Sequence, residues 1–181
     1  MPQPAIFLDR DGTLVEEVNF LSRVEDLRVF SYSRQAVRSL KEHGFRIFVV
    51  TNQSGIARRK FAETAMHSIH EEIQNQLDGL IDAFYYCPHL PDAGCRCRKP
   101  DTGMIEAAAR DFDIDLTRSW MVGDKKLDVE TGKNALLRTA LVLTGYGAAH
   151  RATLNFEPEM ITPDLGDAVT QICLSTAKVV V

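Results

Sequence analysis

The chain has 181 residues, of which 21 are basic and 25 acidic, so its formal net charge is −4. A content of 45% hydrophobic and 25% charged residues is typical of a folded globular protein and excludes an intrinsically disordered chain. The acidic balance argues against a general nucleic-acid-binding surface, which is normally basic. No apolar run reaches the roughly 18 residues of a membrane helix, and the first residues lack the basic start of a signal peptide. We therefore expect a single domain (residues 1–181) in the cytoplasm, with no nucleic-acid or membrane partner.

Short apolar segments alternate with amphipathic segments along the chain. The pattern predicts strands at residues 5–8, 46–51, 83–86, 119–122 and 139–143, and helices at 34–43, 64–80, 103–112, 127–135 and 164–174. Nearly all of the strands are apolar on both faces, which is typical of a parallel sheet covered by helices on each side. The predicted fold class is therefore α/β, a doubly wound parallel sheet. Ligands of such sheets bind outside the carboxyl ends of the strands.

Two aspartates, Asp9 and Asp11, follow the first strand. A carboxylate can attack phosphorus and form an acyl phosphate. Two carboxylates repel a phosphate dianion, so this chemistry needs a divalent cation, and Mg²⁺ suits ligands that are all oxygen. A polar turn in which Asp11 bonds its own backbone is the alternative interpretation.

Two later segments extend this candidate site. Asp124 would complete an oxygen cage for Mg²⁺ with Asp9 and the backbone carbonyl of Asp11, and Asp128 could orient Lys99 or a metal-bound water. The alternative is an acidic helix N-terminus, which is more plausible for Asp128 than for Asp124. Residues 51–55 could cradle a phosphate with hydroxyl and backbone N–H groups, although taken alone they also fit an ordinary loop.

The clearest metal signal is a cluster of three cysteines and one histidine. Cys87, His89, Cys95 and Cys97 match a closed tetrahedral Zn²⁺ site, and four protein ligands make the zinc structural. The loop at residues 87–97 leads directly into Arg98 and Lys99. A loop fixed by metal can direct such cations into a site, where Lys99 would neutralise a phosphoryl group and Arg98 would bind a second oxyanion.

These motifs together resemble the haloacid-dehalogenase-like phosphatases. The matching motifs, in chain order, are Asp9-Arg-Asp-Gly-Thr, Thr51-Asn-Gln, Lys99 and Gly123-Asp124 with Asp128. The segments Tyr86-Cys-Pro-His89 and Cys95-Arg-Cys-Arg-Lys-Pro100 further resemble the zinc-containing branch of that family. The resemblance covers about residues 5–147. It implies a haloacid-dehalogenase-like Rossmannoid fold with a zinc-binding loop and no large cap domain.

The resemblance also implies a mechanism and a set of site residues. Asp9 is expected to be the nucleophile and Asp11 the general acid and base, while Thr51 and Lys99 hold phosphoryl oxygens. Arg98 completes the set of expected catalytic residues. Mg²⁺ is expected at Asp9, Asp11 and Asp124. Carried over residue by residue, Arg98 and Lys125 correspond to positions that bind a distal phosphate. The expected substrate-binding residues are Glu17, Val18, Asn19, Phe20, Thr51, Asn52, Gln53, Ser54, Arg98, Lys99 and Lys125.

Two substrates occur in this branch of the family. Residues 54–58, Tyr85-Tyr86, Gly103-Met104 and Lys125 resemble the members that act on the C7 phosphate of D-glycero-D-manno-heptose 1,7-bisphosphate, and the resemblance makes this the expected substrate. The five residues between His89 and Cys95 instead resemble the histidinol-phosphate phosphatases. The sequence does not determine the anomer. The remaining alternatives are a phosphotransferase, a polynucleotide-end phosphatase and an inactive, zinc-stabilised interaction module. The expected partner is a small phosphorylated sugar, and the expected state is a monomer.

Overall fold

A computed structural model of the chain describes residues 2–177. Its centre is a six-stranded parallel sheet in the order β3-β2-β1-β4-β5-β6. The strands are β1 (Ala5–Leu8), β2 (Arg46–Asn52), β3 (Ala83–Cys87), β4 (Trp120–Gly123), β5 (Arg138–Val142) and β6 (Met160–Thr162). The strand order reverses at β1, which pairs with both β2 and β4.

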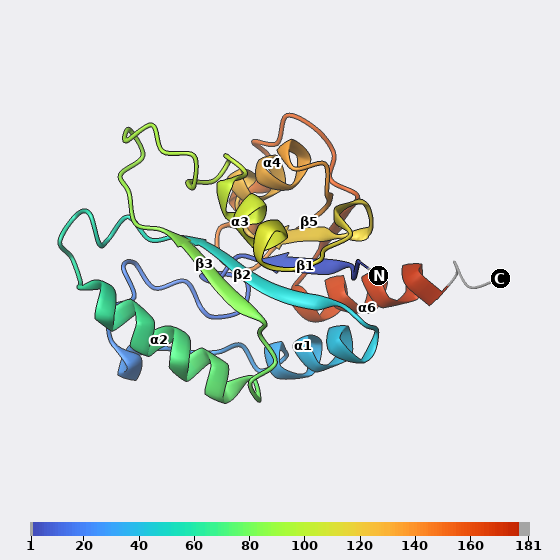
Figure 1. The fold of residues 1–181 in the computed structure, drawn as a ribbon, viewed down its shortest axis with the longest axis horizontal. Coiled ribbons are helices and arrows are strands. Elements are labelled where there is room, and N and C mark those ends of the chain that lie inside the picture. The colour runs from blue at the N-terminus through green and yellow to red at the C-terminus, as the bar shows by residue number, and fades with distance from the viewer. Residues whose placement is uncertain (1, 178–181) are drawn as a thin grey trace.

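Helices cover both faces of this sheet (Figure 1). They are α1 (Ser33–Glu42), α2 (Glu63–Gln76), α3 (Gly103–Asp111), α4 (Lys126–Asn134), α5 (Gly147–Arg151) and α6 (Leu165–Ala177). Alternate strand residues point to opposite faces. Ile6 and Leu8 therefore lie in one core with α1, α2 and α6, whereas Ala5 and Phe7 lie in a second core with α3. These two buried cores confirm the predicted doubly wound sheet.

The boundaries of the five predicted strands are correct to within one residue, but two short elements were missed. These are β6 and α5, which have three and five residues and are too short for a periodic pattern to reveal. The predicted helix at 64–80 was too long, because α2 ends at Gln76. Asp78 and Gly79 adopt φ values of 57° and 70°, which a right-handed helix cannot accommodate.

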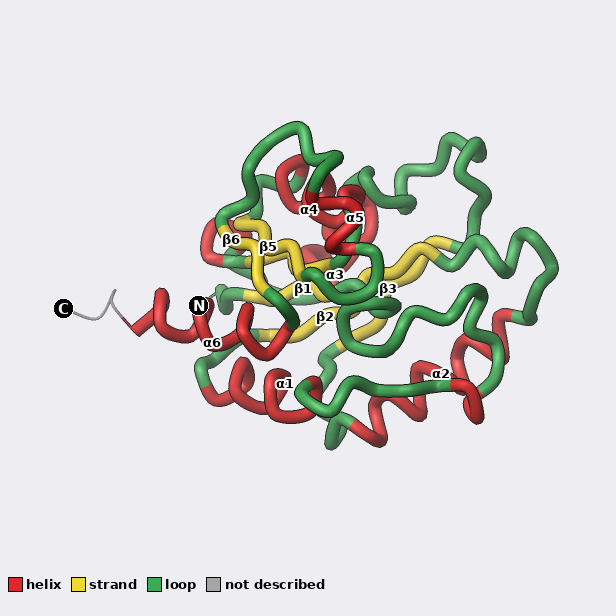
Figure 2. The backbone as a smooth tube through the Cα atoms, turned by 180° about the vertical axis from the view of Figure 1, so that it is seen from behind, coloured by secondary structure: helices red, strands yellow, loops and turns green. Residues whose placement is uncertain are grey.

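The long connections at the carboxyl ends of the strands gather on one side of the molecule (Figure 2). The connection from β1 to α1 covers residues 9–32 and contains a single 3-10 turn, Val24–Asp26. Within residues 2–177 no connection forms a separate cap domain, as the sequence predicted. The same described part of the chain has no helix with the length and apolar character needed to span a membrane.

Candidate active site

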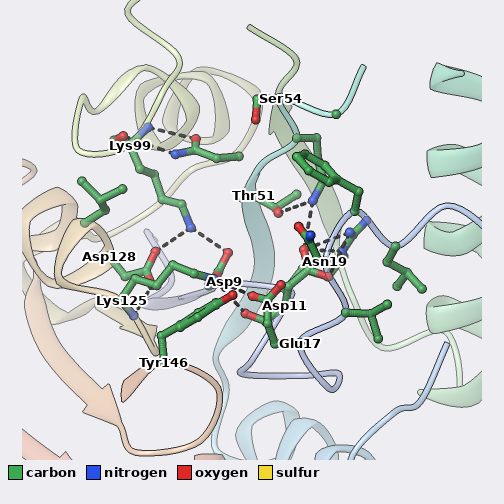
Figure 3. Close-up of a pocket in the computed structure, with 18 of the residues that line it drawn as sticks. Asp9, Asp11, Glu17, Asn19, Thr51, Ser54, Lys99, Lys125, Asp128 and Tyr146 are labelled. Carbon is green, nitrogen blue, oxygen red and sulfur yellow. Dashed lines mark hydrogen bonds and ion pairs between the residues drawn. The ribbon is translucent and has the colours of Figure 1, made fainter. Parts of the chain in front are cut away.

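A pocket opens where the strand order reverses, at the carboxyl ends of β1, β2 and β4 (Figure 3). This is the position at which open parallel sheets bind ligands. Every residue predicted to bind substrate lines it. The lining residues are Asp9, Arg10, Asp11, Glu17, Val18, Asn19, Phe20, Leu21, Thr51, Asn52, Gln53, Ser54, Gly55, Arg98, Lys99, Lys125, Leu127, Asp128 and Tyr146.

Lys99 joins two of the predicted carboxylates at the floor of this pocket. Its ammonium lies 2.7 Å from Asp9 Oδ1 and 2.6 Å from Asp128 Oδ1, and it donates a hydrogen bond of 2.9 Å to the carbonyl of Val50. All three side chains are buried, so these contacts are poorly screened by water. Asp128 therefore contacts Lys99, as the first of its two predicted roles requires. Asp128 Oδ2 also accepts a bond from the Lys125 backbone N–H, so Asp128 stabilises the start of α4 as well.

Asp11 has different partners from Asp9. Both of its carboxylate oxygens accept hydrogen bonds of 2.9–3.1 Å from the Arg10 guanidinium, and Oδ2 accepts a 3.0 Å bond from Gln53 Nε2. Gln53 Nε2 also donates a 2.8 Å bond to Thr51 Oγ1. Asp11 and Thr51, predicted from separate motifs, therefore lie on one hydrogen-bonded network.

Backbone atoms of neighbouring segments enclose the Asp124 carboxylate. Its Oδ2 accepts a 2.8 Å bond from the N–H of Tyr146, and the side chain is fully buried. A Cβ atom added at Gly12 or Gly145 would lie 2.3 or 2.2 Å from this same oxygen, which is closer than atoms can approach. Glycine is therefore required at both positions, because the backbone packs directly on the Asp124 carboxylate.

The ammonium of Lys125 lies among the oxygens predicted to bind Mg²⁺. It is 3.7 Å from Asp9 Oδ2, 3.4 Å from the Asp11 carbonyl oxygen and 3.4 Å from Asp124 Oδ1, and it pairs with Glu17 at 2.9 Å. Asp9, Asp124 and Asp128 offer oxygens within 4.8 Å of one another. This group is composed of oxygen alone, which fits Mg²⁺.

The charges around this group also favour a divalent cation. When ionised, Asp9, Asp124, Asp128 and Glu17 face only two ammonium groups, those of Lys99 and Lys125, which leaves two negative charges uncompensated. The imbalance appears in the pKa of Asp124. Burial, followed by the Asp9 and Asp128 carboxylates, raises this pKa to about 8. Burial alone would also raise the pKa of Asp9, but Lys99 and Lys125 together outweigh it and lower that pKa.

Two hydrogen bonds join the end of β2 to the segment that carries Arg98 and Lys99. Asn52 Oδ1 accepts a 3.1 Å bond from the Lys99 backbone N–H, and Asn52 Nδ2 donates a 3.2 Å bond to the Lys99 carbonyl. Arg98 lines the pocket and donates from Nη1 to the carbonyl of His89 at 3.2 Å. These hydrogen bonds thus fix the backbone of Lys99, whose side chain extends into the pocket.

The predicted zinc ligands come together immediately before this segment. Cys87 Sγ lies 3.5 Å from Cys95 Sγ and 3.6 Å from His89 Nδ1, which is 3.3 Å from Cys97 Sγ. A tetrahedral Zn²⁺ with bonds of about 2.3 Å to sulfur and about 2.0 Å to nitrogen separates its ligands by roughly 3.5–3.8 Å. The four residues therefore fit a zinc ion, and no fifth position is needed.

Four side chains around the pocket were not singled out from the sequence: Arg10, Leu21, Leu127 and Tyr146. Arg10 lies inside the Asp9-Arg-Asp11 motif, but its contacts with His70 and Asp11 could not be predicted from spacing. Leu127 and Tyr146 follow β4 and β5, and they reach the pocket because β4 pairs with β1. The glycine-rich segment Thr144-Gly-Tyr-Gly147, which follows a strand, was the one signal that could have indicated Tyr146.

Comparison with known proteins identifies the family of this chain. A family described as "HAD-hyrolase-like" matches residues 96–168. The D-glycero-D-manno-heptose-1,7-bisphosphate 7-phosphatase of Thermosynechococcus vestitus is 40% identical to this chain and aligns with 98% of it and 99% of the relative. The chain therefore belongs to the haloacid-dehalogenase-like hydrolases.

Further relatives within this family have closely related names. The D-glycero-beta-D-manno-heptose-1,7-bisphosphate 7-phosphatase of Haemophilus ducreyi is 35% identical, over 95% of this chain and all of the relative. A crystal structure of D,D-heptose 1,7-bisphosphate phosphatase from B. bronchiseptica, complexed with magnesium and phosphate, aligns with a TM-score of 0.89. It is 32% identical and covers 95% of this chain and 99% of its own.

Proposed function

We propose that this chain is a Mg²⁺-dependent phosphatase that hydrolyses the C7 phosphate of D-glycero-D-manno-heptose 1,7-bisphosphate. The observation that carries this proposal is that the Asp9 carboxylate, the buried Lys99 ammonium and two further cations, Arg98 and Lys125, line one pocket. Relatives named for this substrate support it along nearly the whole chain.

The proposed reaction has two steps that both use Asp9 and Asp11. The Asp9 carboxylate attacks phosphorus, the ester P–O bond breaks, and the departing sugar oxygen takes a proton from Asp11. Asp11, now ionised, takes a proton from a water molecule, whose oxygen attacks the phosphoaspartate. The bond to Asp9 then breaks, inorganic phosphate leaves, and Asp11 keeps the proton for the next cycle.

The remaining residues of the pocket hold charge and geometry. Lys99 is placed to exchange part of its contact with Asp9 and Asp128 for a phosphoryl oxygen, and the Thr51 hydroxyl can donate to another. Mg²⁺ would be held by Asp9, Asp124 and the Asp11 carbonyl, where it would neutralise the carboxylates and the incoming phosphate. Zn²⁺ at Cys87, His89, Cys95 and Cys97 would fix the loop ahead of Lys99.

We assign recognition of the leaving group to residues 17–20, Arg98 and Lys125, which all line the pocket. Of these, Arg98 and Lys125 can bind a distal phosphate. Lys125 now contacts four oxygens, so it must exchange some of them to bind that phosphate. Within residues 2–177 the Arg98 guanidinium has one hydrogen bond to exchange, its 3.2 Å bond to the His89 carbonyl, so we expect Arg98 to dominate binding of the distal phosphate.

The substrate is tested by comparing kcat/KM for the heptose 1,7-bisphosphate, in both anomers, with kcat/KM for histidinol phosphate. Histidinol phosphate carries a cationic amine in place of the distal phosphate, and the cations of the pocket should repel it. We expect the bisphosphate to be preferred. A higher kcat/KM for histidinol phosphate would favour the alternative that the short zinc loop suggests.

The role of Arg98 is tested by Arg98→Ala. Loss of a charge-assisted contact of about 1.5–3 kcal/mol should reduce kcat/KM for the bisphosphate by about 10- to 150-fold. An aryl phosphate, which has no distal phosphate, should be affected much less. Arg96→Ala is the matched control, because the Arg96 side chain is 85% exposed on the same loop and does not line the pocket. Equal losses for both substrates would contradict a role in distal recognition.

We further propose that residues 1–181 act as a single phosphatase domain, as a monomer in the cytoplasm. In support, all of the chemistry-bearing groups named above come from one chain and meet at one sheet edge. Light scattering of the active enzyme should give a mass near 20.3 kDa. A dimer that keeps its activity on dilution would contradict the monomer.

A further inference from the structure

Arg10 has an unusual position for a charged residue. It is only 1% exposed, yet its guanidinium lies beside the proposed catalytic pocket. A buried guanidinium persists only when its charge and its N–H groups are all satisfied. The groups that contact this guanidinium therefore indicate the role of Arg10.

One edge of the guanidinium binds Asp11 at two points. Nε and Nη2 each lie 2.9–3.1 Å from the carboxylate oxygens of Asp11. Such a fork fixes the plane and direction of a carboxylate, which a single contact would not do. Gln53 adds a third donor from the other side at 3.0 Å. Arg10 and Gln53, neither of which is a predicted Mg²⁺ ligand, thus set the orientation of the Asp11 carboxylate.

The opposite side of the guanidinium is held by His70 of α2. Arg10 Nη1 lies 3.3 Å from His70 Nε2. Arginine can only donate, so Nε2 must be the ring nitrogen without a proton. Burial, the Arg10 charge and His67 lower the pKa of His70 to about 3, which keeps the ring neutral and able to accept. The ring is stacked on Phe84 of β3 at 4.6 Å, so it cannot turn freely.

We propose that Arg10 is a positioning residue, held by His70, that aims the Asp11 carboxylate at the leaving-group oxygen in the pocket. This inference rests on the proposed function, because it assumes that Asp11 is the general acid. Neither side chain needs to touch the substrate. Arg10 acts through Asp11, and His70 acts through Arg10.

The test uses Arg10→Lys, which keeps the positive charge but cannot form the fork. We measure kcat/KM, which reports the steps up to departure of the leaving group, for the heptose bisphosphate and for p-nitrophenyl phosphate. A misaimed acid slows departure of a sugar alkoxide but hardly affects a nitrophenolate. We therefore expect a loss of about 10- to 100-fold for the sugar and less than about 3-fold for the aryl ester. Equal losses for the two substrates would indicate a structural role and overturn the proposal.

A double-mutant cycle checks that Arg10 acts through Asp11. In an Asp11→Asn background there is no acid left to aim, so adding Arg10→Lys should cost less than about 2-fold on the sugar substrate. If the two losses multiply, the proposal is wrong. If Asp11→Asn alone slows both substrates equally, the role of Asp11 in the proposed function has failed, and that result identifies the failure separately.

His70 provides a further comparison with two variants of different chemistry. His70→Gln retains an acceptor and should keep the ratio of the two kcat/KM values within about 2-fold of wild type. His70→Leu removes the acceptor from a buried N–H and should shift the ratio in the same direction as Arg10→Lys. If the two variants have the same ratio although both remain folded by circular dichroism, His70 does not hold Arg10 for catalysis.

Discussion

The two candidate metal clusters of this molecule are built in different ways. The oxygen cluster of Asp9, Asp124 and Asp128 comes from the ends of β1 and β4 and the first turn of α4, and all three residues are buried. The cluster of Cys87, His89, Cys95 and Cys97 lies in a single loop that begins at the end of β3. One of its members is exposed and two are partly exposed.

This difference indicates what each metal contributes. The carboxylates are placed by hydrogen-bonded strands, and Lys99 and Lys125 already compensate part of their charge. The oxygen cluster therefore keeps its shape without an ion and needs Mg²⁺ for chemistry. Residues 88–102 form no helix or strand, so we expect the loop of the thiol cluster to depend on Zn²⁺ for its shape.

The largest expected effect is that of Asp9→Asn. The variant removes the attacking carboxylate with almost no change in volume, and Lys99 retains its contacts with Asp128 and Val50. Turnover should fall by about 10⁴-fold or more, while the melting temperature changes little. Asp113→Asn is the matched control, since Asp113 is exposed and lies beside Gln3 at the opposite end of the sheet. Wild-type turnover in Asp9→Asn would exclude the phosphoaspartate.

Removing each metal in turn should have different effects at the two clusters. Without Mg²⁺ the zinc-loaded enzyme should lose its activity and keep its melting temperature. Cys97→Ser should instead reduce bound zinc from about one per chain to near zero and lower the melting temperature by several degrees. In a chain of this size each kcal/mol lost corresponds to about 2–4 °C.

Cys173→Ser is the control for the zinc measurement, because Cys173 lies in the core beside Ser39 of α1. Its zinc content should stay at about one per chain, measured by atomic absorption. If Cys97→Ser retains zinc and full stability, the assignment of these four ligands is wrong.

The smallest effect concerns His70, which links α2 to Asp11 through Arg10. Its pKa is lowered to about 3 in the folded protein, against about 6.5 when unfolded. Between pH 7 and pH 5 the unfolded chain takes up a proton here that the folded chain does not. The free energy of unfolding should therefore fall by about 2 kcal/mol through this group as the pH decreases.

Urea denaturation at both pH values measures this loss, and His70→Gln supplies the reference. Other groups titrate equally in the two proteins, so wild type should lose about 2 kcal/mol more than the variant. The same loss in both proteins would mean that His70 is not held neutral in the fold.

The sequence predicted that Asp9 and Asp124 lie together because each follows a strand, whereas the place of Asp128 in the same cluster was not predicted. Once Asp9 and Asp124 are placed at the carboxyl ends of parallel strands, their proximity follows from the topology. The zinc ligands could be predicted equally well, because they lie close together in one segment of the sequence. The first prediction requires one rule of sheet geometry, and the second requires only a local sequence pattern.

The contacts of Arg10, His70 and Tyr146 could not be predicted in this way. His70 reads as an ordinary position on an amphipathic helix, and its contact with Arg10 depends on how closely α2 packs beside β1. Tyr146 is preceded by a glycine whose φ is 54°, which brings its backbone N–H to Asp124. Contacts of this kind come from tertiary packing, which has no periodic signature.

The connection between β1 and α1 is closed at its base by backbone pairing. Val15 bridges Val29, and the Glu16 N–H donates to the Arg28 carbonyl at 2.8 Å. Asp9 and Asp11 lie before this closure, whereas residues 17–20 lie beyond it. On the proposed role of residues 17–20, exchanging the distal part of this loop should change the preferred leaving group and leave Asp9 and Asp11 in place. Grafting residues 17–27 from a relative with another substrate is the corresponding route for redesign.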